Sequence, residues 1–187
     1  MEERLSSKND IIFAGLGGMG VLMAGHILSR AALSKYKHVS WLPSYGVEKR
    51  GGLCECIVIF SNEEIASPII DKAQTVIVFD GSQVETFEHR IRPGGTMLVE
   101  SSGIKDGKKG GDYKLIRVPG LEIATSIGAG QINNFVLLGA YVGLTGAIQP
   151  ELVEDEMEKR FGTKKEVFAN NREAFKRGIE LGRTLTS

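Results

Sequence analysis

Short apolar runs, separated by glycine and polar turns, fill the first two-thirds of the chain. Buried strands are expected at residues 11–14, 39–42, 53–60, 76–79, 96–99 and 115–118. After the first run, apolar residues recur at helical spacing from Val21 to Ala31. Strands that alternate with helices are typical of a mostly parallel sheet with helices on both faces.

The last third of the chain has a helical pattern. Residues 135–144 are apolar almost all round, which predicts a helix buried on every side. This run is shorter than the roughly 20 apolar residues that a membrane span needs, so no membrane association is expected. Gly139, Gly143 and Gly146 are expected to let neighbouring backbones approach closely. A charged helix is expected next, over 151–160, followed by a last amphipathic helix.

These elements together predict one α/β domain over residues 1–187. A chain of 187 residues, 42% hydrophobic and 25% charged, suits a single core. The expected fold is a Rossmann-like three-layer sandwich with a mostly parallel sheet and a helical C-terminal third.

Composition argues against several classes of function. The 23 Lys and Arg residues balance 23 Asp and Glu residues, whereas nucleic-acid binders usually carry a basic excess, so no nucleic-acid partner is expected. Cys54 and Cys56 are too few for an iron–sulfur cluster or a structural zinc ion, so no metal site is expected. Low cysteine usage and a polar N-terminus without an apolar segment favour a cytoplasmic location.

A glycine loop follows the first expected strand. Gly15, Gly17 and Gly20 fit the spacing G-x-G-x-x-G, in which the glycines allow a tight turn, ligand approach and close helix–strand packing. Free amides and a helix N-terminus then favour a phosphate. An NAD site also needs an acid about 20 residues further on, and Leu42-Pro43 stand there instead. The loop therefore favours phosphate binding over ordinary NAD use, with purely structural glycines as the alternative.

A second polar loop, Pro43 to Gly52, follows the second expected strand. Because ligands bind beyond the carboxyl ends of strands in open α/β sheets, the two loops are expected to lie side by side. Arg50 can pair with a phosphate or carboxylate, or with Glu48 to stiffen the loop. Tyr45 can stack on a flat group or plug the end of the sheet.

No set of residues makes a catalytic constellation, so no catalytic residue is expected in this chain. His26, His38 and His89 are scattered, and no hydrolase or zinc-protease motif is present. Asp80 ends a strand and is expected to cap the next helix. Asn133 opens the buried helix and can cap it, or face a ligand or partner.

The two loops, in this order, resemble the gamma subunit of 2-oxoacid:ferredoxin oxidoreductases. The resemblance is carried by residues 15–21, 24–25, 43–52, 61–68, 133–134 and 138–140. The run from Trp41 to Arg50 is most similar to subunits of 2-oxoglutarate-type complexes. The family commonly has glutamine where this chain has Met19, which cannot donate a side-chain hydrogen bond.

The resemblance implies a function within a larger complex, which converts a 2-oxoacid and coenzyme A to acyl-CoA and CO2 and reduces ferredoxin. Alpha and beta subunits would hold thiamine diphosphate, and a ferredoxin-like delta subunit would hold iron–sulfur clusters. This chain would bind no cofactor alone, would hold the assembly together and would help to shape the coenzyme A site. Two alternatives remain: an independent nucleotide-binding oxidoreductase, and a purely structural scaffold.

The same resemblance implies the residues that contact the ligand. They are Gly15, Gly17, Gly18, Met19, Gly20, Ser44, Tyr45, Gly46, Glu48, Arg50, Gly51 and Asn133.

Overall fold

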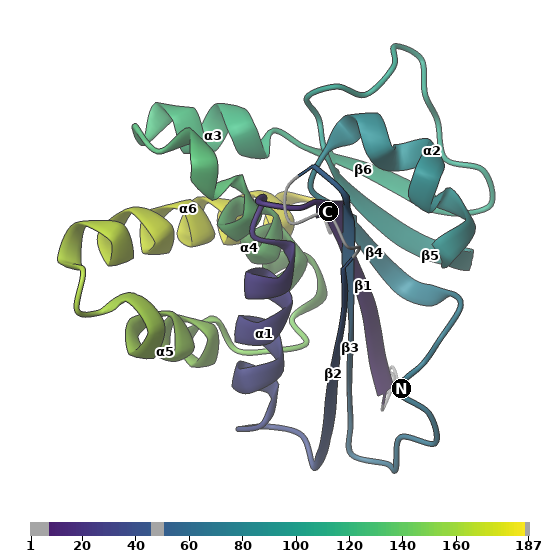
Figure 1. Ribbon diagram of the computed structural model, residues 1–187, viewed down its shortest axis with the longest axis horizontal. Helices are drawn as coiled ribbons and strands as arrows, with labels where there is room; N and C mark the ends of the chain where they lie inside the picture. Colours follow the sequence, from purple (N-terminus) through teal and green to yellow (C-terminus); the bar gives the residue numbers. More distant parts are fainter. Residues whose placement is uncertain (1–7, 46–50, 186–187) are drawn as a thin grey trace.

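The computed structural model describes residues 8–45 and 51–185, and a six-stranded sheet lies at its centre (Figure 1). The strands are β1 (Lys8–Leu16), β2 (His38–Tyr45), β3 (Leu53–Ser61), β4 (Ala73–Val78), β5 (Ile91–Glu100) and β6 (Lys114–Val118). The helices are α1 (Val21–Ala32), α2 (Val84–Phe87), α3 (Gly120–Ser126), α4 (Asn133–Thr145), α5 (Pro150–Phe161) and α6 (Lys165–Thr184). Short 3-10 turns lie at Gly81–Gln83, Glu88–Arg90 and Gly130–Ile132.

The sheet has the order β2-β3-β1-β4-β5-β6 and is mostly parallel, as expected. β1, β4, β5 and β6 pair in parallel, whereas β3 runs antiparallel to both of its neighbours, β1 and β2. β2 ends at Tyr45 and β3 begins at Leu53, so the connection is shorter than the dozen or more residues that a parallel crossover needs, and it suits an antiparallel pair. β2 also continues to Tyr45, so Pro43, Ser44 and Tyr45 belong to a strand and not to the expected loop.

The two faces of the sheet are covered unequally. α1, α4, α5 and α6 lie on one face, and the short α2 lies on the other (Figure 1). Side chains alternate along each strand, so Phe13 packs under the helices whereas Ile12 packs toward α2. The α2 face is completed by apolar residues of the segments that connect the strands, such as Ile65 and Ile104.

α4 and α6 cross with their backbones in close contact. A Cβ added to Gly139 would overlap the carbonyl oxygen of Phe175, and one added to Gly178 would overlap that of Val136. The two backbones therefore touch, which only glycine permits.

The glycines toward the end of α4 differ in role. A Cβ on Gly143 would overlap the carbonyl oxygen of Ile179, so the expected close approach is confirmed for Gly143 as for Gly139. The expectation is wrong for Gly146, which has no atom within 4 Å of an added Cβ. Gly146 instead ends α4 in the left-handed conformation, with a φ of 59°.

Both cysteines of β3 face the helices, and Cys56 is fully buried. Its thiol donates to the carbonyl oxygen of Val21 at 3.8 Å, and an added Cβ on Gly25 of α1 would overlap its sulfur. Burial raises the pKa of the Cys56 thiol to about 12 from an ordinary value near 9.

We therefore expect native Cys56 to resist alkylation. The shift lowers the thiolate fraction at pH 8 by about a thousandfold, and the thiolate is the reactive form. Mass spectrometry after iodoacetamide treatment should find Cys56 unmodified in the native chain and modified within minutes in guanidinium chloride. Equal rates in the two states would contradict the buried position.

Candidate functional site

The glycine loop joins β1 to α1 at the carboxyl end of the sheet (Figure 1). The N–H of Gly17 donates to the carbonyl oxygen of Gly52 at 2.8 Å, and the N–H of Gly51 donates to that of Gly17 at 3.5 Å. The described part of the second loop thus lies beside the glycine loop, as expected. Gly46, Glu48 and Arg50 lie outside the described residues.

The turn itself depends on Gly18 and Gly20. Their φ values of 98° and 76° lie in the left-handed region that favours glycine. Gly15, expected to allow the turn, instead lies within β1. An added Cβ there would be 3.2 Å from Cγ2 of Val21 and 3.3 Å from Cβ of Phe79, so its role is close packing.

Gly20 makes room for α4 and not for a strand. A Cβ added to Gly20 would overlap the side-chain nitrogen of Asn134 and lie 3.0 Å from its Cγ. That nitrogen donates to the carbonyl oxygen of Gly20 at 3.5 Å. The close helix–strand packing expected at Gly20 is made instead by Gly25 of α1 against Cys56 of β3.

Two amides of the loop are already bonded within the protein. The N–H of Gly17 is bonded to Gly52, and the N–H of Met19 donates to the carbonyl oxygen of Leu16 at 3.2 Å. The N–H of Gly18 has no protein acceptor within the ranges that the structure describes. Gly17 and Met19 are therefore not available to a phosphate, whereas Gly18 and the first turn of α1 can still donate.

A hollow of about 580 Å³ lies where β1, β4 and β5 end, and we call it the carboxyl-end hollow. Residues from several segments line it, among them Gly18, Met19, Asp80, Glu100, Gln131 and Asn133. Gly18, Met19 and Asn133 are thereby brought together from distant parts of the sequence, at the edge where open α/β sheets bind ligands.

Glu100 holds the walls of this hollow together. The residue is 3% exposed, and its Oε2 accepts from the N–H of Leu121 at 2.8 Å, at the start of α3. Its Oε1 accepts from the N–H of Ser102 at 3.0 Å, and Oε2 lies 3.5 Å from the side-chain nitrogen of Asn133. An added Cβ on Gly120 would be 2.6 Å from Oε2, so this glycine lets the carboxylate reach the helix.

Glu100 was not among the expected site residues. The signal that could have found it is its position, because it is an acid directly after the apolar run 96–99, as Asp80 is directly after the run 76–79. Asp80 caps the 3-10 turn that follows it, which confirms its expected role. Its Oδ1 accepts from the N–H of Ser82 at 2.9 Å and from the Ser82 hydroxyl at 2.7 Å.

Ser44 lies away from the carboxyl-end hollow. Ser44 lines a separate hollow on the α2 face, with Glu55 and Arg90. Nη1 of Arg90 donates to both carboxylate oxygens of Glu55, at 2.8 and 2.7 Å. Tyr45 is the last residue of β2.

The described residues hold no group of three or more His, Cys, Asp or Glu side chains that could bind a metal ion. Within the same ranges, no helix is long and apolar enough to cross a membrane. The histidines remain apart: the ring of His26 packs edge-on against Trp41, with centroids 4.9 Å apart, and His89 lines the hollow of Ser44.

Comparison with known proteins assigns the family. Residues 10–181 match the family model described as pyruvate ferredoxin/flavodoxin oxidoreductase. The chain belongs to this family. Among its relatives is ketoisovalerate oxidoreductase subunit VorA of Methanothermobacter marburgensis, which is 34% identical over 91% of this chain and 36% of VorA. The 2-oxoglutarate synthase subunit KorC of Methanocaldococcus jannaschii is 30% identical over 98% of this chain and 99% of KorC.

Solved structures of the family share the fold. The gamma subunit of a keto/oxoacid ferredoxin oxidoreductase from Geobacter sulfurreducens matches with a TM-score of 0.79 and 28% identity, over 94% of this chain and 99% of its own. The 2-oxoglutarate:ferredoxin oxidoreductase of Magnetococcus marinus, solved with 2-oxoglutarate, coenzyme A and succinyl-CoA, matches with a TM-score of 0.86 and 25% identity. That match covers 97% of this chain and 32% of the other. The chain thus spans about a third of the length of VorA and of the Magnetococcus chain.

Proposed function

We propose that this chain is the gamma subunit of a 2-oxoacid:ferredoxin oxidoreductase. The observation that carries the proposal is the family match over residues 10–181, together with full-length coverage of the stand-alone gamma subunit from Geobacter. The complex would convert a 2-oxoacid and coenzyme A to acyl-CoA and CO2, and two electrons would pass to ferredoxin. The isolated chain would be inactive.

The carboxyl-end hollow supports a role in binding coenzyme A. Gly18, Met19 and Asn133 line it, at the sheet edge where ligands bind in this class of fold. Supporting positions are Gly17 and Gly51, which bond the two loops to each other, and Gly15 and Gly20, which pack closely against Phe79 and Asn134. The proposed site is completed by Tyr45, Gly46, Glu48 and Arg50 of the second segment, whereas Ser44 lines the separate hollow on the α2 face.

The lengths of the relatives support partner subunits. In VorA the matched region is part of a longer chain, whereas in KorC it makes up the whole protein. Where such a domain is a chain of its own, we expect it to pack against separate subunits that correspond to the rest of the longer chain. We propose alpha and beta subunits that hold thiamine diphosphate, a delta subunit with iron–sulfur clusters, and ferredoxin as acceptor, in the cytoplasm.

We propose 2-oxoglutarate as the substrate, supported by the similarity of the run from Trp41 to Arg50. The named relatives include 2-oxoglutarate synthase, ketoisovalerate oxidoreductase and pyruvate synthase subunits. The three corresponding 2-oxoacids should therefore be compared directly, with a higher kcat/KM expected for 2-oxoglutarate. A higher value for either of the other two would contradict this choice.

The proposal is tested by anaerobic purification of the tagged chain from its native cells. We expect larger subunits to co-purify and the complex to reduce ferredoxin when it receives coenzyme A and a 2-oxoacid. Turnover by the isolated chain would contradict it. In the complex, Asn133→Ala should raise the KM of coenzyme A without loss of subunits, with the exposed Asn62→Ala as control. Loss of subunits at an unchanged KM would favour a scaffold.

A further inference from the structure

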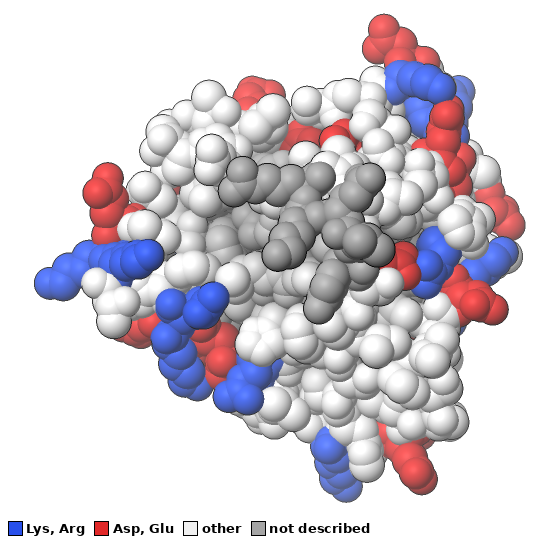
Figure 2. Space-filling view, in the orientation of Figure 1, with Lys and Arg blue, Asp and Glu red and all other residues white. Residues whose placement is uncertain are grey.

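The carboxyl-end hollow is acidic, which is unusual for a site that would receive an anionic ligand. Asp80 and Glu100 line it, and the described lining residues include no Lys or Arg. On the face shown in Figure 2, Lys and Arg side chains lie around the periphery, and red atoms are visible in the recess beside α3. A phosphate placed there would be repelled by both carboxylates.

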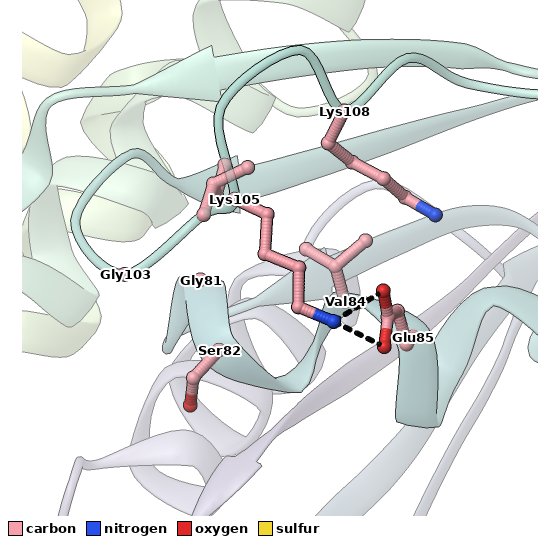
Figure 3. A pocket seen from close by; sticks show the side chains of 8 residues that line it. Gly81, Ser82, Val84, Glu85, Gly103, Lys105 and Lys108 are labelled. Atoms are coloured by element: carbon pink, nitrogen blue, oxygen red, sulfur yellow. Dashed lines mark hydrogen bonds and ion pairs between the residues drawn. The ribbon is translucent and has the colours of Figure 1, made fainter.

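Two lysines of the described residues near the hollow form ion pairs elsewhere. Lys105 and Lys108 follow the lining residue Gly103, in the segment between β5 and β6. Nζ of Lys105 pairs with Glu85 at 2.9 Å, and Nζ of Lys108 pairs with Glu88 at 2.7 Å. Figure 3 shows the Lys105 ammonium directed to the Glu85 carboxylate, in a small pocket next to the hollow. These cations therefore do not offset the charge of Asp80 and Glu100.

The remaining walls of the hollow suit an uncharged group. Met19 and Leu121 give it an apolar surface. Glu100 already accepts from Ser102 and Leu121, and Oδ1 of Asp80 accepts twice from Ser82. Oδ2 of Asp80 has no donor in the part of the chain that the structure describes, so it can accept from a ligand N–H or O–H.

We infer that the carboxyl-end hollow takes an uncharged, hydrogen-bond-donating part of its ligand, and that the phosphates lie outside it. This inference rests on the proposed function. Two parts of coenzyme A have the required chemistry: the amides and hydroxyl of the pantetheine arm, and the amino group and ribose hydroxyl of adenosine. Asp80 is the residue that accepts from this part of the ligand.

The test uses the assembled complex and three inhibitors that compete with coenzyme A: S-methyl-pantetheine, adenosine and pyrophosphate. Asp80→Asn removes the charge and keeps a capping oxygen for Ser82. Asp155→Asn is the matched control, because Asp155 is exposed on α5. Asp80→Ser, which also keeps a capping oxygen, replaces Asp80→Asn if that variant does not assemble.

In Asp80→Asn, we expect the inhibition constant of one uncharged probe to rise at least about tenfold, since the capping oxygen stays on Ser82 and the charged acceptor that faces the ligand becomes an amide N–H donor, so that hydrogen bond is lost. The probe that responds identifies the bound part. The inhibition constant of pyrophosphate in Asp80→Asn should stay within about twofold of the wild-type value. Asp155→Asn should leave the inhibition constants of all three probes unchanged. A tighter pyrophosphate constant with unchanged uncharged probes would overturn the inference, and so would no response from any probe. A wild-type complex without coenzyme A-dependent turnover would instead overturn the proposed function.

Discussion

Replacing Gly139 with alanine is expected to lower the free energy of unfolding by at least about 3 kcal/mol, despite the better helix propensity of alanine. In an open helix this change would stabilise by about 1 kcal/mol. Here the new methyl group would overlap the carbonyl oxygen of Phe175, which belongs to the α6 backbone and cannot rotate away. α4 and α6 would have to separate, and the packing between their buried faces would loosen.

The measurement is thermal unfolding of the purified chain, followed by circular dichroism. For a chain of this size, the loss corresponds to a fall in Tm of roughly 6–12 °C. Gly146→Ala is the control, because the φ of 59° would strain the alanine but its new methyl group would have no neighbour within 4 Å. Gly146→Ala is expected to lower the free energy of unfolding by about 1 kcal/mol. If the Tm of Gly139→Ala is no lower than that of Gly146→Ala, the backbone contact between α4 and α6 does not stabilise the fold as proposed.

The α4–α6 contact also shows what the sequence can predict about packing. Gly139 and Gly143 are four residues apart, on one face of a helix, and their close contact was predictable. The partner was harder to identify, although Gly178 and Gly182 have the same spacing on α6. The spacing of the glycines does not indicate which two helices pack together. Gly146 was misassigned because it has the spacing of the same face but lies just after the helix ends.

Strand positions were predictable and strand direction was not. Apolar runs located all six strands of the described sheet, because burial of a strand leaves a clear composition. The antiparallel course of β3 was missed, although the absence of a helix between 39–42 and 53–60 was the available signal. α3 was missed as well, since its seven residues carry little periodicity.

The candidate site was predictable only in part, because tertiary contacts build it. The glycine spacing correctly placed the turn at the carboxyl end of β1, and the bonds of Gly17 with Gly51 and Gly52 confirmed that the two loops adjoin. The acidic character of the hollow depends on Glu100, which is far from the loops in sequence and meets them only through the parallel sheet.

Gly20→Ala is expected to give the second large effect, a loss of about 3 kcal/mol in the free energy of unfolding. A left-handed φ of 76° costs an alanine roughly 1–2 kcal/mol. The rest comes from Asn134, whose side chain is 4% exposed and would overlap the new methyl group. Because Asn134 lies next to Asn133 in the first turn of α4, its displacement should also raise the KM of coenzyme A in the complex.

Two further variants separate the backbone strain at Gly20 from its contact with Asn134. Gly18→Ala carries the strain of a φ of 98° but adds no contact within 4 Å, so its loss should be about half that of Gly20→Ala. The double variant Gly20→Ala with Asn134→Ala should recover the contact part of the loss, which a double-mutant cycle measures directly. Additive losses in the cycle would mean that Gly20 serves the turn alone. Coupled losses would show that the third glycine of the loop is kept for the asparagine-led helix, which brings Asn133 to the hollow.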